Sequence, residues 1–175
     1  MIFIPLELAG AYLIDPEKLE DERGFFARTF CQKDFEVRGL NHQVAQCNIS
    51  FNAHKGTVRG MHYQSPHGEA KLVRCTKGAI FDVIIDLRPK SPTFREHFGV
   101  ALSEQNRRML YIPEDFAHGF QTIEDNTEVF YQMSEFFLPK NAHGVRWNDP
   151  SFGIRWPEVI TIISERDATY PDFTV

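Results

Sequence analysis

Side chains that suit proton transfer and anion binding are concentrated in one stretch of the sequence. Residues 59–64 read Arg-Gly-Met-His-Tyr-Gln, and they are followed closely by His67, Glu69, Lys71 and Arg74. Histidine changes charge near neutral pH, whereas lysine and arginine stabilise a developing negative charge or hold a phosphate. The stretch therefore has the residue types of an acid–base site, although a barrel histidine bonded only to the backbone fits the sequence equally well.

Two of the seven histidines occupy strand or strand-edge contexts. His62 lies in this stretch, and His118 lies in a Phe-Ala-His-Gly-Phe segment that follows a turn at residues 113–115. The other five histidines lie near loop-like sequence, so these two are the candidates for chemistry. Side chains alternate between the two faces of a strand, so Arg59 should face away from His62 unless Gly60 bends the chain.

The elements that hold these residues are predicted to be strands. Runs rich in β-branched and aromatic residues recur between turn signals, at a spacing typical of an all-β barrel or sandwich. The expected strands span residues 10–14, 43–48, 71–75, 79–87, 97–102, 107–112 and 127–134. The run 81–87 is apolar enough for a core strand behind a turn at Lys77 and Gly78. Helical signal is limited to residues 15–19, 32–38 and a single turn at 103–107.

The composition bounds the class of protein. A chain of 175 residues, of which 42% are hydrophobic, has room for one domain with its own core, so residues 1–175 are predicted to form a single domain. The formal net charge is −5 and no long basic run occurs, so nucleic acid is not an expected partner. A small anion is compatible with this charge, because a few arginines in a pocket act locally.

The cysteines and the apolar segments indicate the compartment. Three cysteines, an odd number, without a secretory start favour reduced thiols, so a cytoplasmic protein is expected. The apolar opening residues 1–6 lack a positive n-region and a convincing cleavage site. No segment approaches the roughly 20 apolar residues that span a bilayer, so no membrane partner is expected.

Seven segments together resemble the dTDP-4-dehydrorhamnose 3,5-epimerase family in order and spacing. They are Asp-Glu-Arg-Gly-Phe-Phe at 21–26, Gln-Cys-Asn at 46–48, Gly-Thr-Val-Arg-Gly-Met-His-Tyr-Gln at 56–64, Lys-Leu-Val-Arg-Cys at 71–75, Ser-Pro-Thr-Phe at 91–94, Ile-Pro-Glu-Asp-Phe-Ala-His-Gly-Phe at 112–120 and Trp-Asn-Asp-Pro at 147–150. The resemblance runs nearly end to end. The combination of Arg-Gly-x-His-x-Gln with Ala-His-Gly-Phe is far more specific than any single short motif.

The resemblance implies an all-β fold, a cupin jelly-roll barrel with a few short helices, and a homodimer that shares its N-terminal strands. It implies an isomerase that uses no metal or other cofactor and acts on a nucleotide-diphosphate sugar. The expected reaction inverts the third carbon, the fifth carbon or both in a 4-keto-6-deoxy sugar, by removing and returning a proton. Such a reaction belongs to deoxysugar biosynthesis, including that of dTDP-rhamnose and lipopolysaccharide.

The resemblance also implies roles for individual residues. The expected catalytic residues are the base His62, its carboxylate partner Asp167, the opposing acid Tyr131, and Lys71 beside the keto oxygen. The expected substrate-binding residues are Arg23, Arg28, Gln46, Asn48, Arg59, His118, Phe136 and Arg166. Taken singly, Arg23 is by default a solvated arginine and Tyr131 a core tyrosine.

Several positions depart from the family pattern. Arg28 stands where the family usually carries a glutamate that contacts the nucleobase. A carboxylate accepts from the thymine ring N–H, whereas arginine offers only donors and better suits the acceptor edge of cytosine. Phe136 and Phe137 replace a tyrosine pair, Ala142 falls near a commonly acidic position, and Arg166 replaces a lysine. A CDP-linked sugar, or inversion of a single carbon, is therefore an alternative.

Two alternative functions belong to a different class of protein: a metal-dependent cupin enzyme and a non-catalytic sugar-binding cupin. Cupin metal sites commonly combine His-x-His with a later glutamate and a distant histidine, and His62, Glu69 and His118 have a spacing of this kind. Gln64 replaces the second histidine, which weakens the case for a metal-dependent oxygenase or isomerase. A non-catalytic sugar-binding cupin would have no need of a base, its carboxylate and an opposing acid together.

Overall fold

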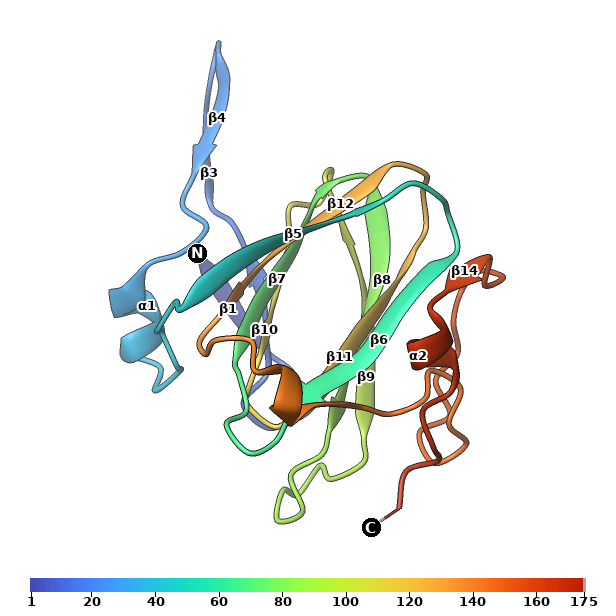
Figure 1. Cartoon of the computed structure of the whole chain (residues 1–175). Helices are drawn as coiled ribbons and strands as arrows, with labels where there is room; N and C mark the ends of the chain where they lie inside the picture. The colour runs from blue at the N-terminus through green and yellow to red at the C-terminus, as the bar shows by residue number, and fades with distance from the viewer. Residues whose placement is uncertain (175) are drawn as a thin grey trace.

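The computed structural model describes residues 1–174 as two β-sheets that face each other and enclose the core (Figure 1). The first sheet contains, in spatial order, β1 (Ile2–Pro5), β2 (Tyr12–Asp15), β10 (Met109–Ile112), β7 (Lys71–Lys77), β12 (Thr127–Met133) and β5 (Gln46–Asn52). The second contains β13 (Ala142–Gly144), β6 (Thr57–Gln64), β11 (Phe116–Thr122), β8 (Ala79–Asp86) and β9 (His97–Ser103), with β14 (Ile162–Ile163) parallel to β6. This is the all-β class that the sequence predicts.

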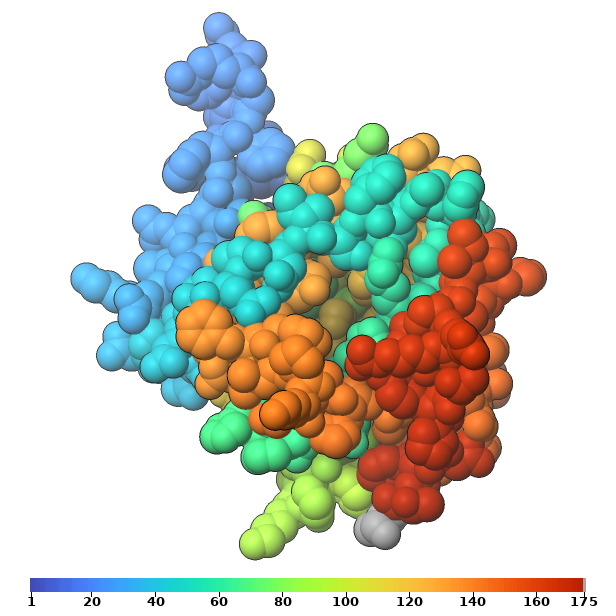
Figure 2. All heavy atoms as spheres, viewed as in Figure 1, coloured from blue at the N-terminus to red at the C-terminus, as the bar shows by residue number. Residues whose placement is uncertain are grey.

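A separate hairpin of β3 (Lys18–Asp21) and β4 (Gly24–Ala27) projects away from the barrel (Figure 1, Figure 2). The helical elements are short: α1 (Gln32–Glu36) after the hairpin, one 3₁₀ turn at Pro139–Asn141, and α2 (Glu165–Ala168) near the C-terminus. Within residues 1–174, no helix has the length and apolar character needed to cross a membrane.

Strand β8 is apolar on both faces because both faces are buried. Ile80 and Ile84 pack in the core between the two sheets. Val83 and Ile85 pack in a second cluster with Phe152, which comes from the C-terminal part of the chain. The four β8 side chains are 0% exposed, and burying each of them stabilises the fold by about 1.5–3 kcal/mol. The sequence prediction of a core strand is confirmed.

Most other predicted strands are confirmed to within a few residues. The strands expected at 71–75, 97–102, 107–112 and 127–134 correspond to β7, β9, β10 and β12. The strand expected at 43–48 begins three residues later as β5, and the one expected at 10–14 begins at Tyr12 as β2. The helix expected at 32–38 is α1, and the single turn after β9 is closed by the Arg107 N–H, which donates to the Ser103 carbonyl at 2.9 Å.

The prediction of a helix at residues 15–19 is wrong. Asp15 ends β2, and Lys18 begins β3, in which Leu19 lies opposite Phe26 of β4. A helix of five residues is unfavourable by itself, because nucleating the first turn orders several residues for one hydrogen bond. Pairing with β4 supplies more backbone hydrogen bonds, so it overrides the weak local signal.

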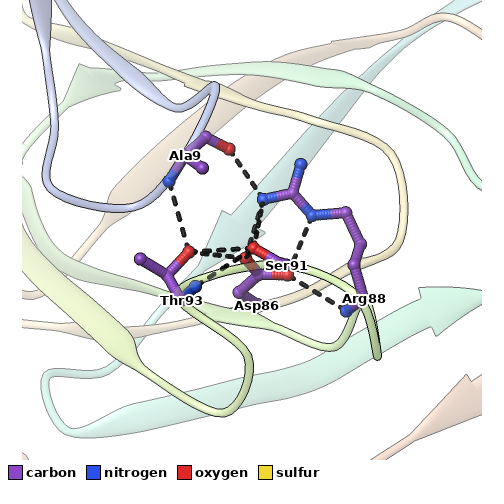
Figure 3. A network of polar contacts seen from close by, with 5 residues as sticks. All are labelled: Ala9, Asp86, Arg88, Ser91 and Thr93. Atoms are coloured by element: carbon purple, nitrogen blue, oxygen red, sulfur yellow. Dashed lines mark hydrogen bonds and ion pairs between the residues drawn. The ribbon is translucent and has the colours of Figure 1, made fainter.

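A buried carboxylate fastens an N-terminal turn to the link between β8 and β9 (Figure 3). Asp86 accepts hydrogen bonds from the side chains of Arg88, Ser91 and Thr93 at 2.5–2.9 Å. Arg88 also donates to the Ala9 carbonyl at 2.7 Å, and the Ala9 N–H donates to Thr93 Oγ1 at 3.3 Å. Burial disfavours the ionised form of Asp86, yet the hydrogen bonds from its neighbours outweigh burial and lower the pKa to about 2.

The sequence left open whether Gly60 bends the chain, and the structure contains this bend. His62 lies opposite His118 of β11, whereas Arg59 lies opposite Phe120, so Gly60 and Met61 of β6 lie opposite the single residue Gly119 of β11. At φ +121°, a Cβ on residue 60 would lie 2.5 Å from the backbone of β11, so a glycine is required. As a result, the Arg59 and His62 side chains both reach one pocket.

Candidate active site

A pocket of about 500 Å³ opens at the barrel. Figure 2 shows its mouth as a hollow bordered by β5, by residues that follow β12 and by the C-terminal segment. This volume lies within the range of small-molecule sites in proteins. The predicted site residues that line it are Arg59, His62, Lys71, His118, Tyr131 and Arg166.

His62 and Asp167 form a hydrogen-bonded pair. His62 Nε2 lies 2.7 Å from Asp167 Oδ1, and the other carboxylate oxygen accepts the Gly60 N–H at 3.2 Å. Ser164 caps α2 by accepting the Asp167 N–H at 3.1 Å, which places the carboxylate behind the imidazole. Burial alone would raise the pKa of Asp167, but the hydrogen bond from His62 and the other donors outweigh it and lower this pKa. The carboxylate is therefore ionised near neutral pH.

A second histidine–carboxylate pair lies on the adjacent strands. His118 Nε2 lies 2.8 Å from Asp82 Oδ1, and Asp82 is 0% exposed. Sequence reasoning missed Asp82, although an aspartate inside the apolar run of β8 is a signal that could have revealed it, because a buried carboxylate needs a partner.

Tyr131 reaches the pocket from the opposite sheet. It lies on β12 of the first sheet, whereas His62 lies on β6 of the second, and both side chains line the pocket. Burial raises the pKa of the Tyr131 phenol above its usual value, the Arg59 cation opposes this rise, and the Glu69 carboxylate adds to it. The phenol is therefore neutral near pH 7 and able to donate its proton.

Lys71 is paired with Glu69. The ammonium nitrogen lies 2.5 Å from Glu69 Oε1, and the two side chains are 8% and 5% exposed. Both residues line the pocket. The pairing of these two side chains was not anticipated from the sequence, in which Glu69 was considered as a metal ligand.

Three of the predicted binding residues lie at the rim of the pocket and do not line it: Gln46, Asn48 and Phe136. Gln46 Oε1 accepts the Phe137 N–H at 2.8 Å, and the Gln46 amide donates to Asn48 Oδ1 at 3.2 Å. The Phe136 carbonyl accepts from Gln64 Nε2 at 3.2 Å. These contacts hold the segment after β12 at the mouth, where the Phe137 side chain does line the pocket.

Arg23 and Arg28 lie on or just after the projecting hairpin and are not pocket residues of their own chain. The Arg23 side chain is 89% exposed, and its guanidinium pairs with Asp21 at 2.5 Å. At the C-terminal side, Arg166 does line the pocket, and its Nε donates to the Tyr170 hydroxyl at 2.6 Å. Tyr170, whose ring also contacts His62 edge to face, was missed by sequence reasoning.

The three side chains that suggested a cupin metal site are not arranged around a common point. His62 is bonded to Asp167, His118 to Asp82, and Glu69 to Lys71. Among residues 1–174, no group of three or more histidine, cysteine or acidic side chains is arranged to hold a metal ion. The geometry therefore lends no support to the metal-dependent alternative.

Comparison with known proteins identifies relatives along the whole chain. The model of the family described as dTDP-4-dehydrorhamnose 3,5-epimerase matches residues 5–174. The dTDP-4-dehydrorhamnose 3,5-epimerase of Methanothermobacter thermautotrophicus is 44% identical over 171 residues, which cover 96% of this chain and 92% of the relative.

Solved structures of the same fold include enzymes with bound nucleotides. The dTDP-4-dehydrorhamnose 3,5-epimerase of Bacillus anthracis, with TDP and PPi bound, is 39% identical with a TM-score of 0.94, covering 98% of this chain and 99% of that one. ChmJ, a 3′-monoepimerase from Streptomyces bikiniensis in complex with dTDP-quinovose, is 32% identical with a TM-score of 0.89, covering 97% and 86%.

These likenesses confirm the family resemblance and the cupin-type barrel that the sequence indicated. They also agree with the site, in which two histidine–carboxylate pairs, a buried lysine and a neutral tyrosine line or support one pocket. The chain therefore belongs to the dTDP-4-dehydrorhamnose 3,5-epimerase family, whose members are isomerases.

Proposed function

We propose that this protein converts dTDP-4-keto-6-deoxyglucose into dTDP-4-dehydrorhamnose by inverting carbons 3 and 5 of the sugar. The observation that supports this most directly is that His62 and Tyr131 line one pocket from facing sheets. Inversion needs a proton to leave one face of the sugar ring and another to return on the opposite face. Two proton-transfer groups on opposing walls meet that requirement.

His62 acts as the base in this proposal. Because its Nε2 is bonded to Asp167, Nδ1 is the ring nitrogen left to take the proton. The ionised carboxylate stabilises the imidazolium that forms, as the aspartate does in a serine-protease triad. Tyr131 then returns a proton to the other face, and burial of its phenol keeps that proton in place until it is needed.

Lys71 stabilises the enolate in this proposal. A proton next to a ketone is less acidic than an imidazolium by on the order of ten pKa units, which corresponds to more than about 10 kcal/mol. Histidine alone cannot supply this free energy, so a positive charge must face the keto oxygen as negative charge develops there. Lys71 is the buried cation on the pocket wall.

The remaining pocket residues hold the nucleotide. Arg59 lines the pocket and is oriented by its Nε, which donates to Asn52 Oδ1 at 2.7 Å, so its guanidinium suits a diphosphate. His118 and Arg166 line the pocket as well. The rim residues Gln46, Asn48 and Phe136 support the mouth, where an aromatic side chain can stack on a base.

We further propose a homodimer in which the β3–β4 hairpin reaches a second copy of the chain. Leu19, Phe25 and Phe26 of the hairpin are 68%, 46% and 69% exposed. Apolar side chains gathered on a projecting element indicate a partner surface. In such a dimer Arg23 and Arg28 complete the partner's pocket, which accounts for their absence from the pocket of their own chain.

We also propose that the protein is a single domain and lies in the cytoplasm. We propose that residues 1–175 form one domain, because within residues 1–174 the two sheets share a core to which both halves of the chain contribute. Cys31, Cys47 and Cys75 are free thiols, which suits the reducing cytoplasm.

The nucleobase and the number of inverted carbons are the finer parts of the proposal. The Bacillus anthracis relative was solved with TDP, which favours thymine, whereas Arg28 favours a base with acceptors. ChmJ is a 3′-monoepimerase, so this fold also supports inversion of one carbon. A CDP-linked substrate and a single inversion are therefore the competing outcomes of the test.

The test is an exchange assay in deuterated water with dTDP- and CDP-4-keto-6-deoxyglucose in parallel. NMR reports deuterium at each sugar carbon, and the configuration of the product reports inversion. Deuterium at carbons 3 and 5 together with the rhamno product, faster with the dTDP sugar, is the expected result. Absence of exchange with either nucleotide would overturn the proposal.

The dimer is tested by complementation between two inactive variants. Co-expressed Arg23→Ala and His62→Ala subunits form mixed dimers, in which the subunit with His62 receives the intact hairpin of the other. We expect these dimers to recover activity, whereas each variant alone stays impaired. No recovery, or a monomer by light scattering, would contradict the shared pocket. Lys33→Ala, on the exposed surface of α1, serves as the charge-matched control.

A further inference from the structure

Glu69 and Lys71 present opposite charges side by side on the pocket wall. They are two residues apart in an extended segment, so their side chains point to the same face. Ala70 between them is fixed by Ser134, because the Ala70 N–H donates to Ser134 Oγ at 2.8 Å and its carbonyl accepts the Ser134 N–H at 2.9 Å. The backbone therefore holds both side chains toward the pocket that they line.

Only one oxygen of the Glu69 carboxylate is engaged. Oε1 meets Lys71, whereas Oε2 is buried and has no hydrogen-bond partner among residues 1–174. Asp167, by contrast, has both oxygens engaged, by His62 and by the Gly60 N–H. Asp82 Oδ2 is also without a partner, but Asp82 does not line the pocket. Glu69 is thus a pocket-lining carboxylate, 5% exposed, with one buried oxygen that has no partner in the described part of the chain.

We infer that Glu69 determines specificity by accepting a hydrogen bond from the sugar hydroxyl on the carbon next to the keto group. This inference rests on the proposed function, because Lys71 must bind the keto oxygen. An α-hydroxy ketone carries an acceptor and a donor on neighbouring carbons. The ammonium of Lys71 and the free oxygen of Glu69 form the complementary donor and acceptor on neighbouring positions of the wall.

The chemistry of the pair explains why a carboxylate suits this position. Hydrogen bonds to a charged acceptor are stronger than those between neutral groups. A sugar without the hydroxyl leaves Oε2 unpaired in a buried site, so it is discriminated against. The same carboxylate adds to the rise in the pKa of the Tyr131 phenol, which favours the protonated donor on the facing wall.

The experiment compares dTDP-4-keto-6-deoxyglucose with its analogue that lacks the hydroxyl on carbon 3. Deuterium incorporation at carbon 5 is measured with both, because carbon 5 is unaltered in the analogue. The proteins are the wild type, Glu69→Gln, Glu69→Leu and, as a matched control, Glu36→Gln on the exposed face of α1. Circular dichroism verifies that each variant is folded.

We expect the wild type to favour the hydroxylated sugar by roughly 10- to 100-fold in kcat/KM at carbon 5. Glu69→Leu should erase this preference, Glu69→Gln should keep part of it through the amide oxygen, and Glu36→Gln should keep all of it. Any loss that acts through a displaced Lys71 lowers exchange in both sugars, because both contain the ketone, so it leaves the ratio unchanged.

Equal rates for the two sugars in the wild type, or an unchanged ratio in both folded Glu69 variants, would overturn the role of Glu69. If one variant fails to fold, the ratio in the other decides. Failure of the proposed function has a different signature, because the wild type would then exchange neither sugar.

Discussion

Two buried carboxylates in this protein, Asp86 and Glu69, are each paired with a basic side chain but differ in how many hydrogen bonds they accept. Both oxygens of Asp86 are engaged, by Arg88 and by the hydroxyls of Ser91 and Thr93. Glu69 has one oxygen on Lys71 and one without a partner among residues 1–174. Asp86 belongs to the polar network of Figure 3, which we call the clamp and which consists of Ala9, Asp86, Arg88, Ser91 and Thr93. Glu69 lines the pocket.

This difference in hydrogen bonding indicates that Asp86 serves stability, whereas Glu69 serves substrate binding. A buried acceptor that stays unpaired costs about 1–3 kcal/mol of folding free energy, so a region that serves stability satisfies its polar atoms. The clamp does so and fastens the N-terminal turn. On the pocket wall, Glu69 leaves one oxygen unpaired by the described residues, the oxygen that we infer accepts from the substrate. Substitutions in the two regions should therefore affect different measurements.

The largest expected effect is on catalysis in the pocket. His62→Ala removes the proposed base, so exchange at both carbons should fall by about 10²- to 10⁴-fold. The free energy of unfolding should fall by no more than about 1–3 kcal/mol, because the buried Asp167 Oδ1 loses its partner. Exchange is measured by NMR in deuterated water and stability by urea unfolding. His97→Ala on the exposed edge of β9 is the control. Exchange at the wild-type rate would remove His62 from the mechanism.

Tyr131→Phe, on the wall that faces His62, is expected to affect inversion but not proton exchange. Without the phenolic proton the base still removes the substrate proton, so deuterium exchange should persist. Inverted product should fall by about 10²-fold, because no donor faces the second side of the ring. Product configuration by NMR distinguishes the two activities. A parallel loss of exchange and inversion would argue against separate roles for the two walls.

The clamp should show the opposite behaviour. Asp86→Asn weakens the pairing with Arg88 and removes an acceptor, so we expect a loss of about 2–4 kcal/mol in the free energy of unfolding. Turnover by the folded variant should remain within about twofold of the wild type. Urea unfolding and steady-state assays measure the two quantities. A large fall in turnover with unchanged stability would show that the regions are not separable in this way.

The smallest expected effect is on how the free energy of unfolding depends on pH. The pKa of Asp86 is lowered from 3.8 to about 2 in the folded protein, so the unfolded chain takes up the proton first as pH falls. Its contribution is therefore fully present above about pH 4 and is lost as pH falls toward 2, by about 1–3 kcal/mol. Urea midpoints of the wild type and Asp86→Asn at pH 5 and pH 3 should converge. A constant difference between them would contradict this assignment.

Sequence reasoning reached the strands, the candidate histidines and, through the family resemblance, Asp167 as the partner of His62, but not the partner of His118. The apolar run of β8 and the turn signals are local properties, so they could be recognised directly. The start of the hairpin was wrongly included in a helix predicted at residues 15–19, because the pairing of β3 is decided by β4. Asp82 and Tyr170 were missed, because each contacts a histidine far along the chain, His118 and His62 respectively.

The amino-acid sequence by itself determined the residue types available for acid–base chemistry, the apolar core strand and the glycine where β6 bends. The tertiary structure brings the expected partner Asp167 to His62 and supplies Asp82 as the unexpected partner of His118. Asp167 reaches His62 across 105 residues, and Tyr131 faces it from another sheet. The physical reason is that strand register and barrel closure set these neighbours, and both depend on contacts between distant segments rather than on local propensity.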